Sequence, residues 1–352
     1  MRRGVAALLL WVAFVSWAFA AGVPRAADAS GGDASRVPGP LRVTVLLEHE
    51  PLEGTFAGLV TKGVRDAAGS AMVEVRVVPL PEDREEALRR AAKEGGLVVV
   101  SSDGFHAALR DNANNFRRTM FGCLDASVRA KNIMSVTFAD EQGAFLAGAA
   151  AAMATVRAGI PGINPDATIG FLAGEDVPAI RSLFWGYSEG ARLVRPGVRV
   201  VQGVAGSFDA PDAAVREAGR LLDQGADVVL LAAGNGNAAA REAIRAKGAH
   251  VVVMDVPDVG DGTLISVGKR ADRAAAAVVA AARGTFPGGE ILTYDLANDG
   301  VVVGELGEAV SRADPELARD VARRLGELRR EIATGGIRLK SLRERTLCDC
   351  QQ

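Results

Sequence analysis

Residues 227–255 have the sequence DVVLLAAGNGNAAAREAIRAKGAHVVVMD, and they contain the unit that decides the fold. Two short apolar runs, residues 228–231 and 251–254, are rich in Val and Leu, as in strands that are buried on both faces of a sheet. Between them, residues 238–247 carry Ala, Arg and Glu with helical spacing. Strand, helix and strand in this order predict a βαβ unit, in which the two strands are parallel.

The same alternation extends in both directions along the chain. One run of strands and helices covers residues 41–103, and a second starts at residue 168 and closes at residue 255. We predict strands at residues 41–47, 73–78, 97–100, 120–124, 133–138, 168–172, 198–201, 228–231, 251–254, 264–267 and 301–306. We predict helices at residues 82–94, 141–154, 212–224, 238–247, 270–283 and 315–333.

These strands are too many for one small sheet, so the fold class is α/β with two Rossmann-like lobes, each a parallel sheet covered by helices. We expect residues 41–140 and about 262–288 in the N-terminal lobe. We expect residues 141–261 and about 289–342 in the C-terminal lobe, followed by a tail at residues 343–352. Several crossings between the lobes would form a multi-strand hinge. Ligands of open α/β sheets bind at the carboxyl ends of the strands, so two facing lobes predict a ligand cleft between them.

The N-terminus has the pattern of an export signal. Arg2 and Arg3 precede an apolar run at residues 5–20, and Ala18 and Ala20 are the small residues that a signal peptidase recognises. We expect a signal peptide at residues 1–20 and a flexible linker at residues 21–40. A membrane anchor is the alternative, but the run is short for a bilayer span. No Cys follows it that could carry a lipid, so we expect a soluble periplasmic or secreted protein.

Composition excludes several classes of function. A formal net charge of -2 argues against a nucleic-acid partner. The three histidines, His49, His106 and His250, are scattered without metal-ligand spacing, and three cysteines are too few for a disulfide framework. No G-x-S-x-G elbow is present. With neither a nucleophile nor a metal cluster, we expect no enzyme, no cofactor and no metal, and capture of a small molecule.

A glycine turn follows the strand at residues 228–231. Gly234, Asn235 and Gly236 open a helix, and Asp255 ends the next strand about 20 residues later. This spacing is similar to the dinucleotide fingerprint, although Ala239 stands at the third glycine. A smaller site, in which helix amides and a carboxylate hold the hydroxyls of a ribose or another polyol, is an alternative, and so is a plain tight turn.

Other candidates lie at the ends of predicted elements. Lys269 ends the strand that begins near residue 264, from which its ammonium group could enter the cleft. Aromatic residues are only 5% of the chain, and Phe56, Phe105, Phe184 and Trp185 all lie near predicted strand-to-helix junctions. Two such rings could sandwich a flat heterocycle, although core packing is the alternative for each of them.

Several longer blocks, in this order, resemble the basic membrane protein family of substrate-binding proteins, which are similar to purine-nucleoside receptors. The resemblance extends from Phe105 to about Leu342. Its blocks are VTFADEQGAFLAG at residues 136–148, IGFLAG at 169–174, FWGYSEGA at 184–191, GSFD at 206–209, the glycine turn at 234–237, VMD at 253–255, SVGKR at 266–270 and GGI at 335–337.

This resemblance implies a type I periplasmic-binding-protein fold and service to an ABC importer, with a membrane permease as partner. It also implies that Asp255 and Lys269 hold ribose hydroxyls. Phe56 would cover one face of the base, and Phe184 or Trp185 the other. The loop that contains Asp103 and Phe105 would line the cleft.

The N-terminal ligand block departs from the family. Residues 52–57 have the sequence LEGTFA, so the acidic pair and the Asn of the family pattern are absent. Glu48 or Glu53 is the candidate replacement for the acid that contacts the base. A purine nucleoside or a related small molecule is therefore the expected ligand, bound by a monomer, and its identity stays open.

Two other functions fit the same residues. A ligand-sensing partner of a membrane receptor would need the same cleft. An enzyme with a nucleotide cofactor would use the turn that begins at Gly234, together with Asp255.

Overall fold

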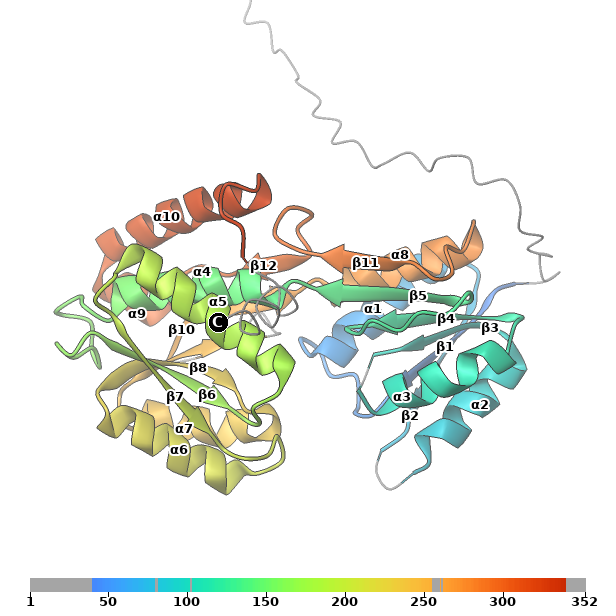
Figure 1. Cartoon of the computed structure of the whole chain (residues 1–352), viewed down its shortest axis with the longest axis horizontal. Helices are drawn as coiled ribbons and strands as arrows, with labels where there is room; N and C mark the ends of the chain where they lie inside the picture. Colours follow the sequence, from blue (N-terminus) through green and yellow to red (C-terminus); the bar gives the residue numbers. More distant parts are fainter. Residues whose placement is uncertain (1–39, 80–81, 102, 255–259, 261, 340–352) are drawn as a thin grey trace, which may run out of the picture. The chain divides into compact units, whose positions relative to one another are not determined.

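The computed structural model describes residues 40–79, 82–101, 103–254, 260 and 262–339. The described chain forms two α/β lobes, each built on a six-stranded sheet (Figure 1). The prediction of two lobes with parallel sheets is confirmed. The predicted signal peptide and linker, apart from residue 40, and the tail at residues 343–352 lie outside the described residues.

The first lobe has a wholly parallel sheet with the strand order β11-β5-β4-β3-β1-β2. Its strands are β1 (Arg42–Leu47), β2 (Met72–Val77), β3 (Gly96–Val100), β4 (Thr119–Leu124), β5 (Ile133–Phe138) and β11 (Ile291–Tyr294). Helices α1 (Phe56–Ala68) and α8 (Ala271–Arg283) pack on one face. Helices α2 (Arg84–Glu94) and α3 (Asp103–Asn112) pack on the other, and the short 3-10 helix η1 (Ala113–Asn115) follows α3.

The second lobe has the strand order β12-β10-β9-β8-β6-β7, in which only β12 is antiparallel to its neighbour. Its strands are β6 (Thr168–Ala173), β7 (Arg199–Val204), β8 (Ala226–Ala232), β9 (His250–Val253), β10 (Thr263–Lys269) and β12 (Val301–Val303). One face carries α4 (Asp140–Ala154), α5 (Pro178–Val194), α9 (Glu308–Ala313) and α10 (Pro315–Ala333). The other carries α6 (Pro211–Asp223) and α7 (Asn237–Ala246), and the 3-10 helix η2 (Gly234–Gly236) precedes α7.

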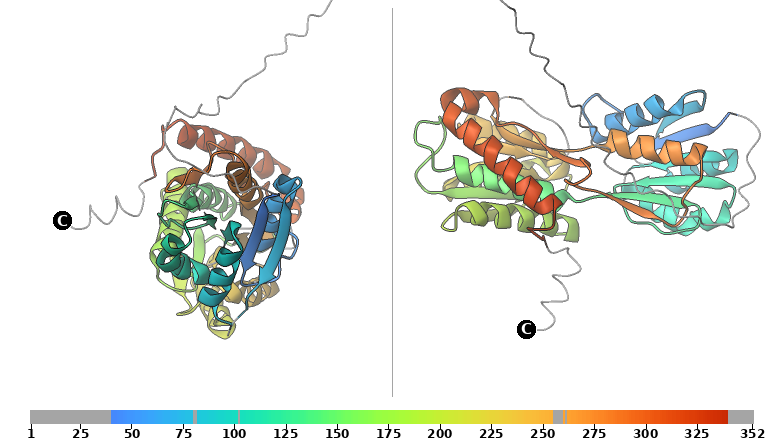
Figure 2. Two further views of the ribbon diagram at one scale, coloured as in Figure 1. Left: turned by 90° about the vertical axis from the view of Figure 1, so that its right-hand side faces the viewer. Right: turned by 90° about the horizontal axis from the view of Figure 1, so that it is seen from above.

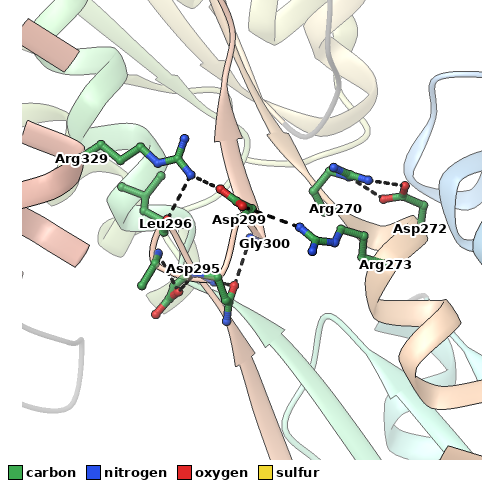
Figure 3. Close-up of polar contacts among 10 residues, drawn as sticks. Arg270, Asp272, Arg273, Asp295, Leu296, Asp299, Gly300 and Arg329 are labelled. Carbon is green, nitrogen blue, oxygen red and sulfur yellow. Dashed lines mark hydrogen bonds and ion pairs between the residues drawn. The ribbon is translucent and has the colours of Figure 1, made fainter. Parts of the chain in front are cut away.

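The chain crosses between the two sheets three times: from β5 to α4, from β10 to α8, and from β11 to β12. The last crossing is a tight turn in which Asp295 accepts hydrogen bonds from the backbone of Ala297 and Asn298 (Figure 3). Asp299, at φ 57°, pairs with Arg329 of α10, and its other carboxylate oxygen lies 4.0 Å from Arg273 of α8. The turn therefore has polar contacts with helices of both lobes.

These crossings correct the predicted lobe boundaries. We placed residues 262–288 in the first lobe, but β10 pairs with β9 and β12 of the second sheet. We placed residues 289–342 in the second lobe, but β11, a strand that we did not predict, pairs with β5 of the first sheet. The reason is physical: an apolar run indicates a strand, whereas its hydrogen-bonding partners are distant in sequence and leave no local pattern.

Helices α4 and α5 touch backbone to backbone. A Cβ atom on Gly148 would lie 2.0 Å from the carbonyl oxygen of Tyr187, and a Cβ on Gly190 would lie 1.8 Å from that of Phe145. Helix α4 is buried along nearly its whole length between α5, α10 and the sheet (Figure 2). Since α4 begins at Asp140, directly after the first crossing, this close contact helps to fix the position of Asp140.

We predict that Gly190→Ala lowers the free energy of unfolding by about 2 kcal/mol or more, because the new methyl group forces the two helices apart. The matched control is Gly219→Ala in α6, where a Cβ meets nothing within 4 Å. That change should stabilise the protein by about 0.5–1 kcal/mol, since alanine restricts the unfolded chain and favours the helix. Chemical denaturation of both variants measures the difference, and equal stabilities would contradict the packing argument.

Candidate functional site

A buried ammonium group joins elements of the two lobes. Lys269, the last residue of β10, is 8% exposed, and its Nζ lies 2.9 Å from Oδ2 of Asp125 and 2.9 Å from Oδ2 of Asp140. Asp125 directly follows β4 in the first sheet, and Asp140 begins α4. All three residues therefore lie at the carboxyl ends of parallel strands or just beyond them, where ligands of α/β folds bind.

Two aromatic rings complete what we call the Lys269 cluster: Lys269, Asp125, Asp140, Phe56 and Phe138. The Nζ atom lies 5.7 Å from the centroid of each ring, within the range of a cation–π interaction. The two rings meet edge to face, with centroids 6.0 Å apart and an interplanar angle of 80°. The structure thus brings together two predicted site residues, Lys269 and Phe56, that are far apart in sequence.

Local structure explains how Phe56 reaches this place. It is the first residue of α1, and the side chain of Thr55 caps that helix by accepting a hydrogen bond of 3.1 Å from the backbone of Gly58. The Phe56 ring is half-buried. Its neighbour Phe138 also contacts Tyr294 of β11, with ring centroids 5.8 Å apart. A ring at this position is held by its neighbours and still keeps some exposed surface.

Asp125, Asp140 and Phe138 were not predicted as site residues from the sequence. A signal was present, because Asp125 and Asp140 each come within two residues of the end of a predicted strand, as Asp255 does. Asp125 also has a positive φ of 62°, which is uncommon outside glycine and most tolerated by Asn and Asp. Its N–H donates to the carbonyl of Val136, 2.8 Å away, so the turn that presents its carboxylate is fixed by the backbone of β5.

Glu48 lies at the carboxyl end of β1 with its charge already paired. Its Oε1 is 2.7 Å from Nε of Arg84, and both side chains are mostly buried. A Cβ on Gly104 would lie 2.0 Å from the same oxygen, so Glu48 lies against the first turn of α3. Asp103 begins that helix, at the carboxyl end of β3. Both residues therefore lie on the ligand-binding edge of the first sheet.

The structure corrects the role of Phe105. This residue is fully buried, and its ring packs in the core of the first lobe among α2, α3 and the sheet. An aromatic residue in the first turn of a helix has the same sequence pattern whether its ring points into the core or into a cleft. Only the packing of the folded chain distinguishes a core ring from a cleft ring.

Phe184 and Trp185 lie in the second turn of α5. Phe184 is half-buried against the core of the second lobe, where its ring meets Phe171 edge to face with centroids 5.4 Å apart. Trp185 is also half-buried. As partners for a heterocycle they stay predictions.

Backbone hydrogen bonds and close packing with neighbouring residues fix the glycine turn at residues 234–236. The backbone N–H of Asn235 donates to the carbonyl of Phe208 at 2.8 Å, and that of Gly236 to Ala233 at 3.1 Å. A Cβ on Gly234 would lie 2.8 Å from the same Phe208 oxygen. These contacts explain the glycines by close packing, and they occupy amides that a pyrophosphate would need. The geometry therefore favours the tight turn over the dinucleotide site, while Asp255 lies outside the described residues.

The Asn235 side chain also serves this loop, because its Nδ2 donates to Oδ1 of Asp209 at 3.1 Å. Gly234 and Asn235 are exposed at the carboxyl end of β8, whereas Gly236 is buried. The turn therefore lies at the ligand-binding edge of the second sheet, where Gly234 and Asn235 are exposed.

One buried carboxyl group lies away from this edge. Asp227 is 1% exposed near the amino end of β8, and burial raises its pKa to about 6. It accepts hydrogen bonds from Oγ1 of Thr155 at 2.5 Å and from the backbone of Asn164 at 3.0 Å. A perturbed pKa often marks a functional site, but here the carboxyl group anchors the loop between α4 and β6.

The described residues contain neither a metal-binding cluster nor a membrane-spanning helix. Among residues 40–79, 82–101, 103–254, 260 and 262–339, no three His, Cys, Asp or Glu side chains could hold a metal ion. None of the helices in these ranges is long and apolar enough to cross a membrane.

The model of the Bmp family, described as ABC transporter substrate-binding protein PnrA-like, matches residues 57–325. The chain belongs to this family. Its sequence is 29% identical over 257 residues to the ABC transporter nucleoside-binding protein BmpA of Lactococcus lactis subsp. cremoris, an alignment that covers 64% of this chain and 71% of the relative. The resemblance inferred from the sequence blocks is thereby confirmed.

Solved structures of other solute-binding proteins agree in fold. An ABC transporter solute-binding protein from Aeropyrum pernix K1 aligns with a TM-score of 0.73 at 22% identity, over 86% of this chain and 94% of that one. A solute-binding protein from Conexibacter woesei aligns with a TM-score of 0.67 at 19% identity, over 86% and 99%. As a Bmp member, the chain is a substrate-binding protein of the ABC-transporter type.

We predict that Lys269→Met lowers the free energy of unfolding by about 2–4 kcal/mol, because it removes the cation that pairs with two partly buried carboxylates. The exposed Lys247 provides the control, and Lys247→Met should change stability by less than about 0.5 kcal/mol. Adding Asp140→Asn to Lys269→Met should recover part of the loss in a double-mutant cycle of denaturation curves. Additive effects would show that the two groups do not interact.

We predict a pH-dependent contribution from Asp227. Its folded pKa of about 6 lies above the ordinary value of 3.8, so the folded state keeps a proton that the unfolded state loses. Stability from this group therefore falls as the pH rises from about 4 to about 6, by up to about 3 kcal/mol. Denaturation of wild type and Asp227→Asn across this range measures it: the stability difference between wild type and variant should shrink as the pH rises. A pH-independent difference would contradict a raised pKa.

Proposed function

We propose that this protein captures a nucleoside-like molecule outside the cytoplasm, in a cleft at the carboxyl ends of its strands, and delivers it to an ABC permease. The single observation that carries the proposal is the Lys269 cluster, in which a buried ammonium, two carboxylates and two aromatic rings converge from both lobes. Membership of the Bmp family supports the transport part.

The chemistry of the cluster suits a sugar with vicinal hydroxyl groups. A hydroxyl group both donates and accepts a hydrogen bond, so it can donate to Asp125 or Asp140 and accept from the Lys269 ammonium. The carboxylates of Asp125 and Asp140 provide acceptors beside the ammonium donor of Lys269. The resemblance to the family adds Asp255 as a further acceptor for the ribose.

The rings suit the flat part of such a ligand. Phe56 keeps exposed surface beside the ammonium, which is the arrangement needed to stack on a base while the sugar lies against the charges. Phe184 or Trp185 would cover the other face of the base after the lobes close, and the three crossings would act as the hinge. The relative from Lactococcus lactis, named as nucleoside-binding, supports this class of ligand.

Glu48 and Arg84 offer a place for the polar edge of the base. Their ion pair at the carboxyl end of β1 carries both an acceptor and donors, and it lies on the same edge of the first sheet as Asp125. A purine has donor and acceptor groups on its edge, which the Glu48–Arg84 pair could match. Ligand identity then depends on this pair rather than on the acidic motif that residues 52–57 lack.

Isothermal titration calorimetry with inosine, adenosine, guanosine, uridine and free ribose tests the proposal. We expect at least one nucleoside to bind more tightly than ribose, and Asp255→Ala and Lys269→Met each to weaken binding by about tenfold or more, as for loss of a charge-assisted hydrogen bond. The exposed Lys62, which pairs with Asp66 on the surface, provides the control variant Lys62→Met with unchanged affinity.

Asp255→Ala keeps the test valid if Lys269→Met folds poorly, because it leaves the ion pairs of Lys269 with Asp125 and Asp140 in place. Binding of no nucleoside by the folded wild type would overturn the ligand class. Tight binding that survives both variants would overturn the site.

A further inference from the structure

The second lobe contains a pocket that shares no residue with the Lys269 cluster. It lies between α10, α4 and the segment from β12 to α9, and its volume is about 450 Å³. Pockets that bind small organic molecules have volumes of about 300–1,000 Å³, so the space is sufficient for one such ligand.

The floor of the pocket is apolar. Leu146 of α4, Leu306, Val321 and Leu325 line it, and each of these side chains is at least nine-tenths buried. A wall of this kind binds a hydrocarbon chain, because burial of apolar surface is the main favourable contribution and no polar group of the ligand is needed there.

A glycine in the middle of α10 helps to keep the pocket open. Gly326 lines it, and a Cβ at this position would have Arg330 Nη1 as its nearest heavy atom, 3.9 Å away. Close packing with the described chain therefore does not require glycine here, although glycine destabilises a helix interior relative to alanine. A larger side chain at residue 326 would project into the pocket, so the glycine preserves its volume.

The lining includes a cationic side chain. Arg319 and Glu305 both line the pocket and are exposed, and among the described residues no carboxylate lies within 4.0 Å of the Arg319 guanidinium. Arg329, which also lines the pocket, already pairs with Asp299 and donates to the carbonyl of Leu296 at 3.3 Å (Figure 3). The guanidinium of Arg319 is thus the one of these two that can receive an anion.

We propose that this pocket is a second ligand site, which takes a small amphiphile with a linear hydrocarbon chain and a carboxylate, such as a medium-chain fatty acid. The chain lies along Leu146, Val321 and Leu325, and the carboxylate accepts hydrogen bonds from Arg319. The site is independent of the ligand that the cleft binds.

Calorimetry of the full chain with sodium octanoate tests this site, with octyltrimethylammonium as the probe of opposite charge. We expect octanoate to bind with a Kd of order 1 mM, given its ten non-hydrogen atoms, and the cation to bind more weakly. Gly326→Leu fills the pocket and should weaken octanoate binding about tenfold or more. Arg319→Ala should weaken it about two- to fivefold, as expected for an exposed ion pair.

Two matched controls separate the site from general effects. Gly219→Leu makes the same change in α6, where a Cβ meets nothing within 4 Å, and Arg323→Ala removes an α10 cation that pairs with Glu327 outside the pocket. Both should leave octanoate affinity unchanged. The proposal is overturned if octanoate does not bind, or if Gly326→Leu and Arg319→Ala bind it as the wild type does.

Discussion

The ammonium group of Lys269 can be buried only because carboxylates from separate parts of the chain meet it. Burying an unpaired charge is strongly unfavourable, so the end of β10, the turn after β4 and the start of α4 must reach their places together. Asp125 adopts a positive φ to take part, and the backbone of β5 holds that turn in place. The two sheets therefore have a polar connection at the edge where their parallel strands end.

Packing in the second lobe supports this connection. Helix α4 starts at Asp140 and is fixed against α5 by glycines that let the two backbones touch. The crossing from β11 to β12 contacts α8 and α10 through Asp299. Only short segments form the three crossings between the sheets, and short crossings of this kind are typical of hinges between domains.

The features that resemble catalysis or cofactor binding have structural explanations. The glycine turn at Gly234 packs on the loop around Phe208, and its amides bond within the loop. The carboxyl group of Asp227, whose pKa is raised by burial, anchors a loop at the opposite edge of the sheet from the Lys269 cluster. This distribution agrees with membership of a family of substrate-binding proteins.

The sequence by itself determined the class of fold, the alternation of elements and the family, because periodic burial and short motifs are local properties. It also marked Lys269 and Phe56. Only the tertiary structure decided that β10 belongs to the second sheet and β11 to the first, that Phe105 is a core residue, and that Asp125, Asp140 and Phe138 surround Lys269. Strand partners and charge partners lie up to about 150 residues apart here, and such pairs arise from packing of the whole chain, which no local pattern records.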